Sequence, residues 1–320
     1  MLPLTNIDLR LIHVFLKVVE CRGFTAAQSE LGLSAPTIST HMASLEERLG
    51  CRLCDRGRIG FKLTSKGEIV YEAAQRLFAA MHEFSSQTGA LKGRLAGDLF
   101  VGIHDNTVTD PNAPFHRVIH RFMGRGARVH IHLQIASPLE LQRKLIEGSL
   151  HVAIGIAHKS VDGLEYEPLY REDVRLFCSK EHPLFQCRDD DIGIEDIRSA
   201  NVVSRGYWKE RDLDYLGLDV SAATVWDMET QLILIRSGRY VGLLPIHYAQ
   251  RWVERGELRA LLPDELQFET PISIITRRGG EKSLVLRKFL EDLREVFAEV
   301  GQGAQARIVA FPSVEGKPAW

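Results

Sequence analysis

The sequence predicts an α/β protein that begins with a small, mostly helical module and continues as a larger body of alternating strands and helices. Its 320 residues exceed the length of one ordinary compact domain. Apolar residues recur at helical spacing over roughly the first 90 residues, whereas after Gly93 and Gly97 short β-type runs alternate with helices. The formal net charge also differs between the two parts of the chain, at about +3 for residues 1–95 and about −5 for the rest.

Bulk composition narrows the class of protein. With 45% hydrophobic and 26% charged residues, the chain falls in the soluble globular range, and it has no run of about 18 apolar residues. The N-terminus has no basic region followed by an apolar one, so we expect a cytoplasmic protein without a membrane partner. The five cysteines are an odd number, and the one CxxC spacing, from Cys51 to Cys54, has no second CxxC to pair with it. They therefore argue against a disulfide framework and structural zinc, and we expect no cofactor.

Three helices are predicted in the N-terminal module. Residues 8–21 carry apolar side chains at i, i+3, i+4 and i+7, which is the stripe of an amphipathic helix. Thr25 and Gln28 fit a capping box that opens a short second helix. Ser34 can cap a third helix, with Pro36 in its first turn, where no amide donor is needed. The last two helices indicate a helix-turn-helix.

Such a motif presents the N-terminal part of its second helix to base edges in the major groove of DNA. A basic hairpin follows over residues 53–63, with Arg52, Arg56, Arg58 and Lys62 in and around a turn from Gly57 to Gly60. This hairpin is typical of a wing that contacts phosphates or the minor groove, and the alternative is an ordinary solvated hairpin. The exposed side chains expected on the reading helix are Thr37, Thr40, His41 and Ser44.

A long helix is predicted to start at Thr64 and to continue for roughly 26 residues. It would extend about 40 Å, too far to be covered by so small a module, and its apolar residues follow a 3–4 alternation that favours a partner helix. We therefore expect a homodimer that places two reading helices on a palindromic duplex. The apolar seam comprises Val70, Ala73, Leu77, Ala80, Phe84 and Leu91.

These residues resemble the LysR-type family of bacterial transcription regulators. The motifs that carry the resemblance are Phe24-Thr25-Ala26-Ala27, Leu33-Ser34-x-Pro36-x-Ile38-Ser39, Leu45-Glu46-x-x-Leu49-Gly50, Arg52-Leu53 and Leu63-Thr64-x-x-Gly67-Glu68. The resemblance implies that the reading helix and wing contact DNA through Thr25, Ser34, Ala35, Pro36, Thr37, Ser39, Thr40, His41, Arg56 and Arg58. Ala35 stands where a Gln is frequent and Thr40 where an Arg is frequent, so the operator sequence cannot be inherited.

The body contains two sets of strands and helices, which predict two α/β lobes with parallel sheets. It resembles the two-lobed, periplasmic-binding-protein-like sensor of the same family. The expected division is residues 1–64 for the winged helix-turn-helix, 65–92 for the dimerisation helix, 93–300 for an effector-binding domain and 301–320 for a tail. Within the body, we expect a first lobe of about 96–168 with 268–300, and a second lobe of about 169–267.

A small-molecule effector is expected in the crevice between the lobes, beyond the carboxyl ends of the strands. Short hydroxyl and amide groups there would suit a carboxylate or hydroxylated ligand, although the same residue types also cap helices and build turns. The candidate effector residues are Asn106, Thr107, Ser137, Ser204, Trp226 and Gly242.

Two other groups of residues suggest alternatives. His116 and His120 share a helix face and His130 and His132 a strand face, but they have no Cys or carboxylate at diagnostic spacing. We interpret them as surface or interface histidines and expect no metal site. Cys178 and Cys187 are nine residues apart and are similar in spacing to the redox pair of peroxide-sensing LysR members. Their location in the chain differs from that of the redox pair, so a redox-responsive regulator ranks second to an effector-binding one.

An enzyme is a third possibility, because two-lobed α/β folds also support catalysis. The sequence lacks a Gly-x-Ser-x-Gly elbow, a Gly-x-Gly-x-x-Gly fingerprint, a P-loop and a His-Glu-x-x-His motif, so no catalytic residue can be nominated. An α/β binding protein or enzyme with an appended DNA module stays as the alternative. The main expectation is a regulator, not an enzyme, that forms dimers and, through its sensor domains, tetramers, with RNA polymerase as a further partner.

Overall fold

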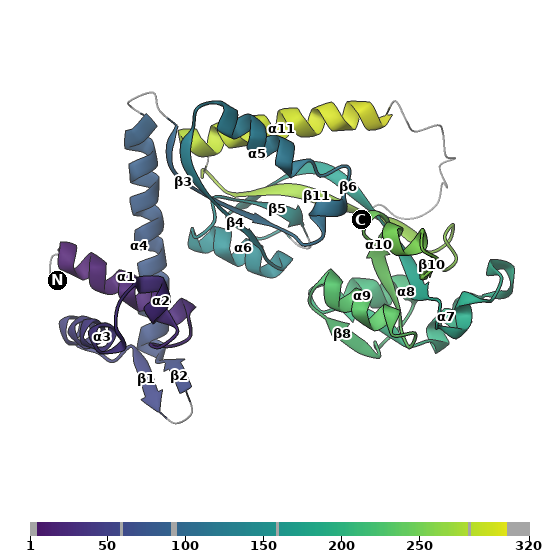
Figure 1. Cartoon of the computed structure of the whole chain (residues 1–320), viewed down its shortest axis with the longest axis horizontal. Helices are drawn as coiled ribbons and strands as arrows, with labels where there is room; N and C mark the ends of the chain where they lie inside the picture. The colour runs from purple at the N-terminus through teal and green to yellow at the C-terminus, as the bar shows by residue number, and fades with distance from the viewer. Residues whose placement is uncertain (1–4, 58–59, 91–94, 158–159, 281–282, 306–320) are drawn as a thin grey trace. The chain divides into compact units, whose positions relative to one another are not determined.

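A computed structural model describes residues 5–57, 60–90, 95–157, 160–280 and 283–305, drawn in Figure 1. These divide into two compact units, one formed essentially by residues up to Ser85 and the other by nearly all of the rest. Within these described ranges, no helix is long and apolar enough to cross a membrane. Each unit has its own hydrophobic core, and each is described separately.

The first unit packs three helices against a two-stranded hairpin and the start of a long helix (Figure 1). Phe15, Ile38 and Met42 are fully buried at its centre, so the apolar stripes predicted from the sequence do form the core. The elements are α1 (Asn6–Glu20), α2 (Ala27–Leu31), α3 (Ala35–Leu49), β1 (Cys54–Gly57), β2 (Gly60–Leu63) and α4 (Ser65–Ala90).

The ends of these helices differ from the prediction at one point. A capping box opens α1, where the Thr5 hydroxyl accepts from Asp8 N–H and the Asp8 carboxylate accepts from Thr5 N–H. The capping box predicted at Thr25 is wrong, because Ala26 precedes α2 in a helical conformation and no side chain caps it. The Gln28 side chain instead accepts from Ala35 N–H at 3.1 Å, which joins the two helices of the helix-turn-helix.

The long helix α4 begins where the sequence predicts it. The Thr64 hydroxyl accepts from Gly67 N–H at 2.9 Å and donates to the Arg52 carbonyl at 2.8 Å, so it both caps the helix and fastens it to the hairpin. A Cβ on Gly67 would lie 1.9 Å from the Leu53 carbonyl oxygen. Only glycine therefore allows the first turn of α4 to approach the hairpin so closely.

One nine-stranded mixed sheet runs through the second unit, in the order β4-β3-β5-β11-β6-β9-β7-β8 with β10 beside β6. Strands β4, β3 and β5 are parallel to one another, as are β9, β7 and β8, whereas β6 and β11 are antiparallel to their neighbours. The strands are β3 (Ala96–Ile103), β4 (Arg128–Ile135), β5 (Val152–Ile156), β6 (Leu164–Ser179), β7 (Val202–Arg205), β8 (Ala223–Val225), β9 (Val241–Pro245), β10 (Leu258–Ala260) and β11 (Gln267–Arg277).

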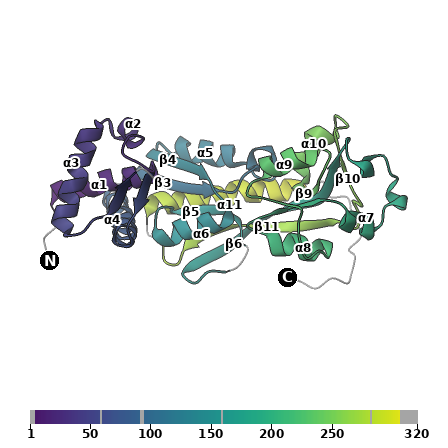
Figure 2. The same ribbon diagram turned by 90° about the horizontal axis from the view of Figure 1, so that it is seen from below.

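This topology produces two lobes. The first lobe contains β3, β4 and β5, and the second contains β7, β8, β9 and β10. Strands β6 and β11 lie side by side and connect the lobes, because residues 164–175 of β6 pair with β11 and residues 174–177 pair with β9 (Figure 2). The parallel sheet predicted from the sequence thus holds within each lobe but not at the connection.

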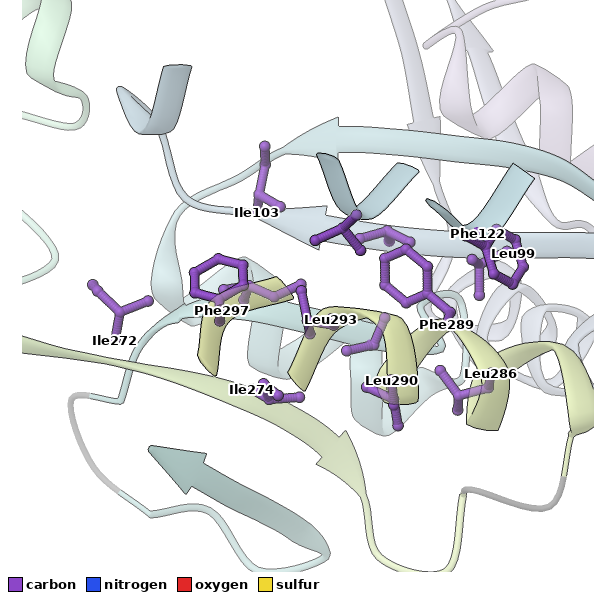
Figure 3. Packing of buried hydrophobic residues seen from close by; sticks show 14 of the residues in the cluster. Leu99, Ile103, Phe122, Ile272, Ile274, Leu286, Phe289, Leu290, Leu293 and Phe297 are labelled. Carbon is purple, nitrogen blue, oxygen red and sulfur yellow. The ribbon is translucent and has the colours of Figure 1, made fainter. Parts of the chain in front are cut away.

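Helices cover the sheet and complete the core. In the first lobe, α11 lies beside α5 over the sheet, and Phe122 meets Phe289 edge to face with ring centroids 5.5 Å apart (Figures 1 and 3). Leu290 and Leu293 are fully buried on the same face of α11. The helices are α5 (Phe115–Gly124), α6 (Pro138–Glu147), α7 (Ile194–Ser199), α8 (Lys209–Leu216), α9 (Met228–Arg236), α10 (Ile246–Val253) and α11 (Leu284–Gln305).

Candidate nucleic-acid interface and ligand pocket

Helix α3 begins at the cap that the sequence predicts. Ser34 Oγ accepts from Thr37 N–H at 3.4 Å and lies 2.8 Å from Thr37 Oγ1, with Pro36 in the first turn. The opposite face of the helix buries Ile38 and Met42 completely. The buried face fixes the rotation of α3 about its axis, so its polar N-terminal face is turned away from the core.

The residues predicted to read DNA lie at the start of α3, except for Thr25, which precedes α2. Thr25, Ser34, Pro36 and Thr40 are exposed, whereas Ala35, Thr37, Ser39 and His41 are half-buried. Thr40 Oγ1 donates to the Pro36 carbonyl at 3.0 Å, so its proton is used within the helix. The surface offers short hydroxyl, imidazole and methyl groups, without the long amide or guanidinium that makes bidentate base contacts.

Polar contacts from outside the turn hold α3 in place. The Arg48 guanidinium donates to the Asp8 carboxylate at 2.9 Å, which ties the end of α3 to the start of α1. Glu46 Oε1 accepts from the backbone N–H groups of Leu53 and Cys54, at 2.7 and 3.4 Å, which fastens α3 to the first strand of the hairpin. Reading helix and hairpin therefore form one rigid body, as a winged helix-turn-helix requires.

The hairpin and α4 carry the remaining predicted residues of this unit. Arg56 lies on β1 opposite Phe61 in the register, and Arg58 lies outside the described residues. On α4, Val70 and Leu77 pack against the core of the first unit, so they are not free for a partner helix. The other described members of the predicted seam are exposed, and Leu91 falls outside the described residues; the exposed members are Ala73, Ala80 and Phe84.

A pocket of about 520 Å³ opens between the two lobes of the second unit. The first lobe contributes Asp105, two residues after β3, and the segment from the end of β4 into α6. The second lobe contributes residues that follow β7 and β8. None of the lining residues that the structure describes is Lys or Arg; they are Asp105, Ile135, Ala136, Ser137, Pro138, Leu139, Glu140, Tyr207, Trp226 and Asp227.

The carboxylates of this pocket are held by helix ends. Asp105 Oδ2 accepts from Met228 N–H at 2.6 Å, so a residue of the first lobe caps α9 of the second. Asp227 caps the same helix through Thr230 N–H at 2.7 Å. Burial raises the pKa of Asp105. Hydrogen bonds from the Ser137 hydroxyl and N–H lower the pKa of Glu140, so that carboxylate carries its charge at neutral pH.

Aromatic side chains from the second lobe face these acids. A Cβ on Gly206 would lie 2.8 Å from the Trp226 ring, so glycine leaves room for the indole there. The neighbouring Arg205 is completely buried and binds Asp212 through its Nε at 2.9 Å and its backbone N–H at 3.0 Å. This ion pair fixes the end of β7 and the turn that places Tyr207 in the pocket wall.

Two of the six predicted effector residues line the pocket, Ser137 and Trp226. The other four do not, and their surroundings explain why. Ser204 Oγ donates to Ser221 Oγ at 2.8 Å, and a Cβ on Gly242 would lie 2.6 Å from Val203 Cγ1, so both serve packing inside the second lobe. Asn106 has a left-handed backbone, with φ of 55°, and lies against Glu172, while Thr107 is buried in a short 3₁₀ helix.

Several lining residues were not predicted from the sequence. Asp105 lies two residues after a strand and Asp227 directly precedes a helix, positions that could have marked both as candidates. Glu140 lies in the first turn of a predicted helix, where acidic residues are common for other reasons. Tyr207 lies between strand and helix without any local pattern. Apart from Ser137, the lining consists of carboxylates, aromatic rings and apolar side chains where hydroxyl and amide groups were expected.

The cysteine pair does not have the features of a redox switch. Cys178 is buried on β6, and burial raises the pKa of its thiol to about 12, so little thiolate forms at neutral pH. Cys187 is half-buried, and its thiol donates to the Pro183 carbonyl at 3.6 Å. These surroundings disfavour the redox-responsive alternative.

The four histidines singled out by the sequence do not converge either. His116 and His120 are exposed on α5. His130 and His132 lie on β4 with ring centroids 4.5 Å apart, and His132 pairs with Asp98 at 2.8 Å. Across the described ranges, the group of His and carboxylate ligand atoms close enough to hold a metal is a different one, formed by Asp110, Glu172 and His247.

Two family models match this chain. Residues 9–68 match the bacterial regulatory helix-turn-helix protein model of the lysR family, and residues 92–298 match the LysR substrate binding domain. The chain belongs to the LysR family of transcriptional regulators. This LysR-type regulator therefore combines a DNA-binding helix-turn-helix with an effector-binding domain, which confirms the fold class and the main function predicted from the sequence.

Relatives of this LysR-type regulator are themselves named as regulators. It is 39% identical over 288 residues to the HTH-type transcriptional activator BauR of Pseudomonas aeruginosa, covering 90% of this chain and 94% of that protein. It is 23% identical to the HTH-type transcriptional regulator BenM of Acinetobacter baylyi, covering 92% and 97% of the two chains.

Solved LysR structures share the fold of this regulator. The LysR family transcriptional regulator CbnR superposes with a TM-score of 0.61 at 22% identity, over 90% of this chain and 98% of that one. Full-length CbnR in complex with its target DNA superposes with a TM-score of 0.62 at 20% identity, over 90% and 99% of the two chains. At this identity the likeness establishes the fold alone.

Proposed function

We propose that this LysR-type regulator binds a palindromic duplex as a homodimer and responds to a small effector that carries a cationic amine. The observation that carries the effector proposal is the pocket between the lobes, with three carboxylates and two aromatic rings and, in its described lining, no basic side chain. In this proposal, residues 1–64 bind DNA, 65–92 form the dimerisation helix, 93–300 bind the effector and 301–320 form a tail.

The proposed DNA contacts come from the start of α3, from Thr25 before α2 and from the hairpin. Thr25, Ser34, Ala35, Pro36, Thr37, Ser39, Thr40 and His41 would lie against the major groove, while Arg56 and Arg58 would contact phosphates or the minor groove. Small hydroxyl and methyl groups read base edges with less discrimination than a bidentate Arg or Gln. We therefore expect part of the sequence preference to come from duplex shape.

Dimerisation is supported by the exposed side of α4. Ile69 and Phe84 are 67% and 68% exposed, and Ala73 and Ala80 lie between them at intervals that keep all four on one face of the helix. Large apolar side chains left in solvent along one stripe are typical of a surface that another helix covers. The dimer proposed here uses this stripe and omits Val70 and Leu77, which already pack in the core of the first unit.

The amine is proposed from charge and shape. Asp105, Glu140 and Asp227 place negative charge on several sides of the pocket, and a bound ammonium would be attracted to them. Tyr207 and Trp226 provide ring faces, on which cations bind favourably. The carboxylate ligand suggested by the sequence would instead meet repulsion from the same three groups.

Regulation would follow from the contact between the lobes. Asp105 of the first lobe caps α9 of the second, so an amine that binds Asp105 changes a contact on which the relative position of the lobes depends. A ligand shifts such an equilibrium only by its difference in affinity for the two arrangements. The relative BauR is named an activator. We therefore propose activation through contact with RNA polymerase, with tetramers formed through the sensor domains.

DNA binding is tested with two variants of the full-length chain. Arg58→Ala should weaken binding of all duplexes about equally and reduce the salt dependence, because a phosphate contact is lost. Thr37→Ala should change the preferred sequence with little change in salt dependence. Affinity is measured by fluorescence anisotropy across a salt series. Binding that is absent, or that does not weaken as salt rises, would contradict the proposal.

The effector class is tested by thermal shift with pairs of probes of similar size. Butylamine and 1,4-diaminobutane should raise the Tm of the full-length chain, whereas butyrate should not. Trp226→Ala and Glu140→Gln should each remove the amine response, and Glu265→Gln, an exposed acid that does not line this pocket, should keep it. Stabilisation by butyrate but not by the amines would restore the carboxylate hypothesis.

A further inference from the structure

We propose that the effector-binding domain binds one divalent transition-metal ion through Asp110, Glu172 and His247. These residues come from three separate parts of the domain: the segment after β3, the connecting strand β6 and the start of α10. One ligand atom from each lies within 4.8 Å of the others. His247 Nε2 is 3.0 Å from Glu172 Oε1 and 3.8 Å from Asp110 Oδ2.

Hydrogen bonds around His247 determine which of its nitrogens is available. The Thr109 hydroxyl donates its one proton to the Asn106 carbonyl at 3.1 Å. Its oxygen lies 2.9 Å from His247 Nδ1 and therefore accepts the Nδ1 proton. A neutral His247 ring then carries a lone pair on Nε2, which points at the Glu172 carboxylate. In metal-binding histidines, the ring nitrogen that does not bind the metal commonly donates its proton to a neighbouring polar group, as Nδ1 does here.

His104 repeats the arrangement on the other side of Glu172. Its Nδ1 lies 3.3 Å from the Ile154 carbonyl, which can only accept, so Nδ1 carries the proton. Its Nε2 lies 4.0 Å from Glu172 Oε1 and has no hydrogen-bond partner among the described residues, although the residue is only 3% exposed. Two imidazole nitrogens thus face one buried carboxylate oxygen, to which the Asn106 amide also donates, at 3.3 Å.

A cation resolves this conflict. Two acceptors that face each other without a proton repel, and a buried carboxylate without a counter-charge is costly. A metal ion among Asp110, Glu172 and His247 would accept the lone pairs and neutralise both acids.

The donor set indicates the class of metal. One imidazole and two carboxylates, with a second imidazole nearby, suit Zn²⁺, Mn²⁺, Co²⁺ or Fe²⁺ better than Mg²⁺ or Ca²⁺, which prefer oxygen ligands alone. Three protein ligands leave coordination positions for water. Solvent reaches the site, since all three ligands line a second pocket of about 450 Å³.

The position of the site suggests what the metal would do. Asp110 and His104 come from the segment after β3 in the first lobe, and His247 comes from the second lobe. Glu172 lies on β6, the strand that connects the two lobes. A bound ion would fasten the lobes to each other at their connection. None of its three ligands lines the pocket proposed for the amine, so metal and effector would occupy different sites.

A proton could take the place of the metal, with a His247 imidazolium paired to Glu172. The two explanations differ in what stabilises the domain. A metal site gives a Tm that rises with added metal at constant pH, and its affinity falls in acid because the ligands must lose their protons. A protonated pair gives a Tm that changes with pH and does not respond to metal.

The test uses the full-length chain freed of metal by chelation and titrated with Zn²⁺ in a calorimeter. We expect one equivalent per chain, a rise in Tm, and no comparable effect of Mg²⁺. His247→Gln and Asp110→Asn should each weaken Zn²⁺ binding at least about tenfold, the usual scale for altered metal-site residues. His116→Gln, an exposed histidine of α5, should bind Zn²⁺ as the wild type does. Absent binding, or unchanged binding in both site variants, would overturn the proposal.

A second measurement uses the wild-type protein and therefore does not depend on whether a site variant folds. Wild-type protein loaded with Co²⁺ should show visible absorption bands of a site with nitrogen ligands and fewer waters than the free ion. A spectrum identical to that of free Co²⁺ would overturn the proposal. The amine thermal shift is recorded on the same samples, so loss of metal binding with an intact amine response refutes the metal site alone.

Discussion

The reading surface of the first unit and the pocket of the second are built in opposite ways. The reading surface lies within residues 25–41, where the cap at Ser34 and the buried Ile38 determine what faces outward. The pocket is assembled from Asp105, residues 135–140, Tyr207 and residues 226–227, which are far apart in the chain. Local patterns therefore predict the first surface, whereas the second exists only after the sheet has brought distant loops together.

The two units also differ in what holds the functional residues. In the first unit, the helix caps Ser34 and Thr64 and the close backbone approach at Gly67 hold them in place. In the second unit, they are held by the buried ion pair of Arg205 and by Asp105, which caps a helix of the opposite lobe. Because each unit has its own core, we expect variants in one unit to lower its unfolding midpoint and leave that of the other unchanged.

The largest effect is expected for Asp212→Ala. This change leaves the buried Arg205 guanidinium without its partner, and loss of one member of a buried ion pair costs about 3–5 kcal/mol. Denaturant unfolding should show the loss in the effector-binding domain and not in the first unit. Asp190→Ala, which removes a carboxylate that is 86% exposed in its pair with Arg188, should have little effect. Equal effects of the two changes would contradict the buried pair.

Gly67→Ala should destabilise the first unit. The added Cβ would meet the Leu53 carbonyl, so either the hairpin or α4 must move, at a cost of about 1–3 kcal/mol. Gly126→Ala provides a contrast, since its φ of 72° makes alanine strained although nothing lies within 4 Å of the added atom. The first change should affect DNA binding and the second should not. An unchanged midpoint of the first unit in Gly67→Ala would refute the close approach.

A smaller loss is expected for Ser34→Ala. It removes the N-cap of α3 and should cost the first unit about 1 kcal/mol. Ser29→Ala is the matched control, because Ser29 is exposed on α2 and contacts only the Ala26 carbonyl, at 3.5 Å. Chemical denaturation followed by circular dichroism compares the two variants. If both lose the same stability, Ser34 does not act as a cap.

The smallest effect concerns pH. Hydrogen bonds from the Thr5 side chain and backbone, with Arg48 nearby, lower the pKa of Asp8 below its ordinary value of 3.8. A depressed pKa in the folded state adds stability that is complete above pH 3.8 and is lost as the pH falls through the folded-state value. Asp8→Asn should therefore flatten the acid limb of the Tm profile of the first unit, whereas Glu20→Gln, at an exposed pair with Lys17, should not.

The sequence predicted most of the fold because its signals are local. Helix periodicity located α1, α3 and α4, and β-type runs located the central strands of both lobes. The first half of β6 and the short strand β10 have no such signal, since residues 165–171 alternate only partly between buried and exposed positions. The antiparallel pairing of β6 with β11 joins residues about 100 positions apart, which no local pattern reveals.

The candidate sites show the same limit. Ser137 and Trp226 were predicted because they follow strands, whereas Ser204 and Gly242 lie within β7 and β9 and serve packing instead. The histidines selected by spacing, such as His116, stay apart. His247 has no neighbour in sequence that marks it, and it meets Glu172 only through the arrangement of α10 and β6. Residue type and spacing nominate candidates, and tertiary contacts decide among them.

Selection of duplexes from a random library tests the central claim most directly. The full-length wild-type chain should enrich an inverted repeat whose half-sites are centred about 10 base pairs apart or a multiple of that, as expected for two reading helices related by a two-fold axis. Binding to the enriched duplex should weaken steeply as salt rises. Enrichment of no sequence, or binding that ignores salt, would contradict the assignment of α3 and the hairpin as the DNA-binding surface.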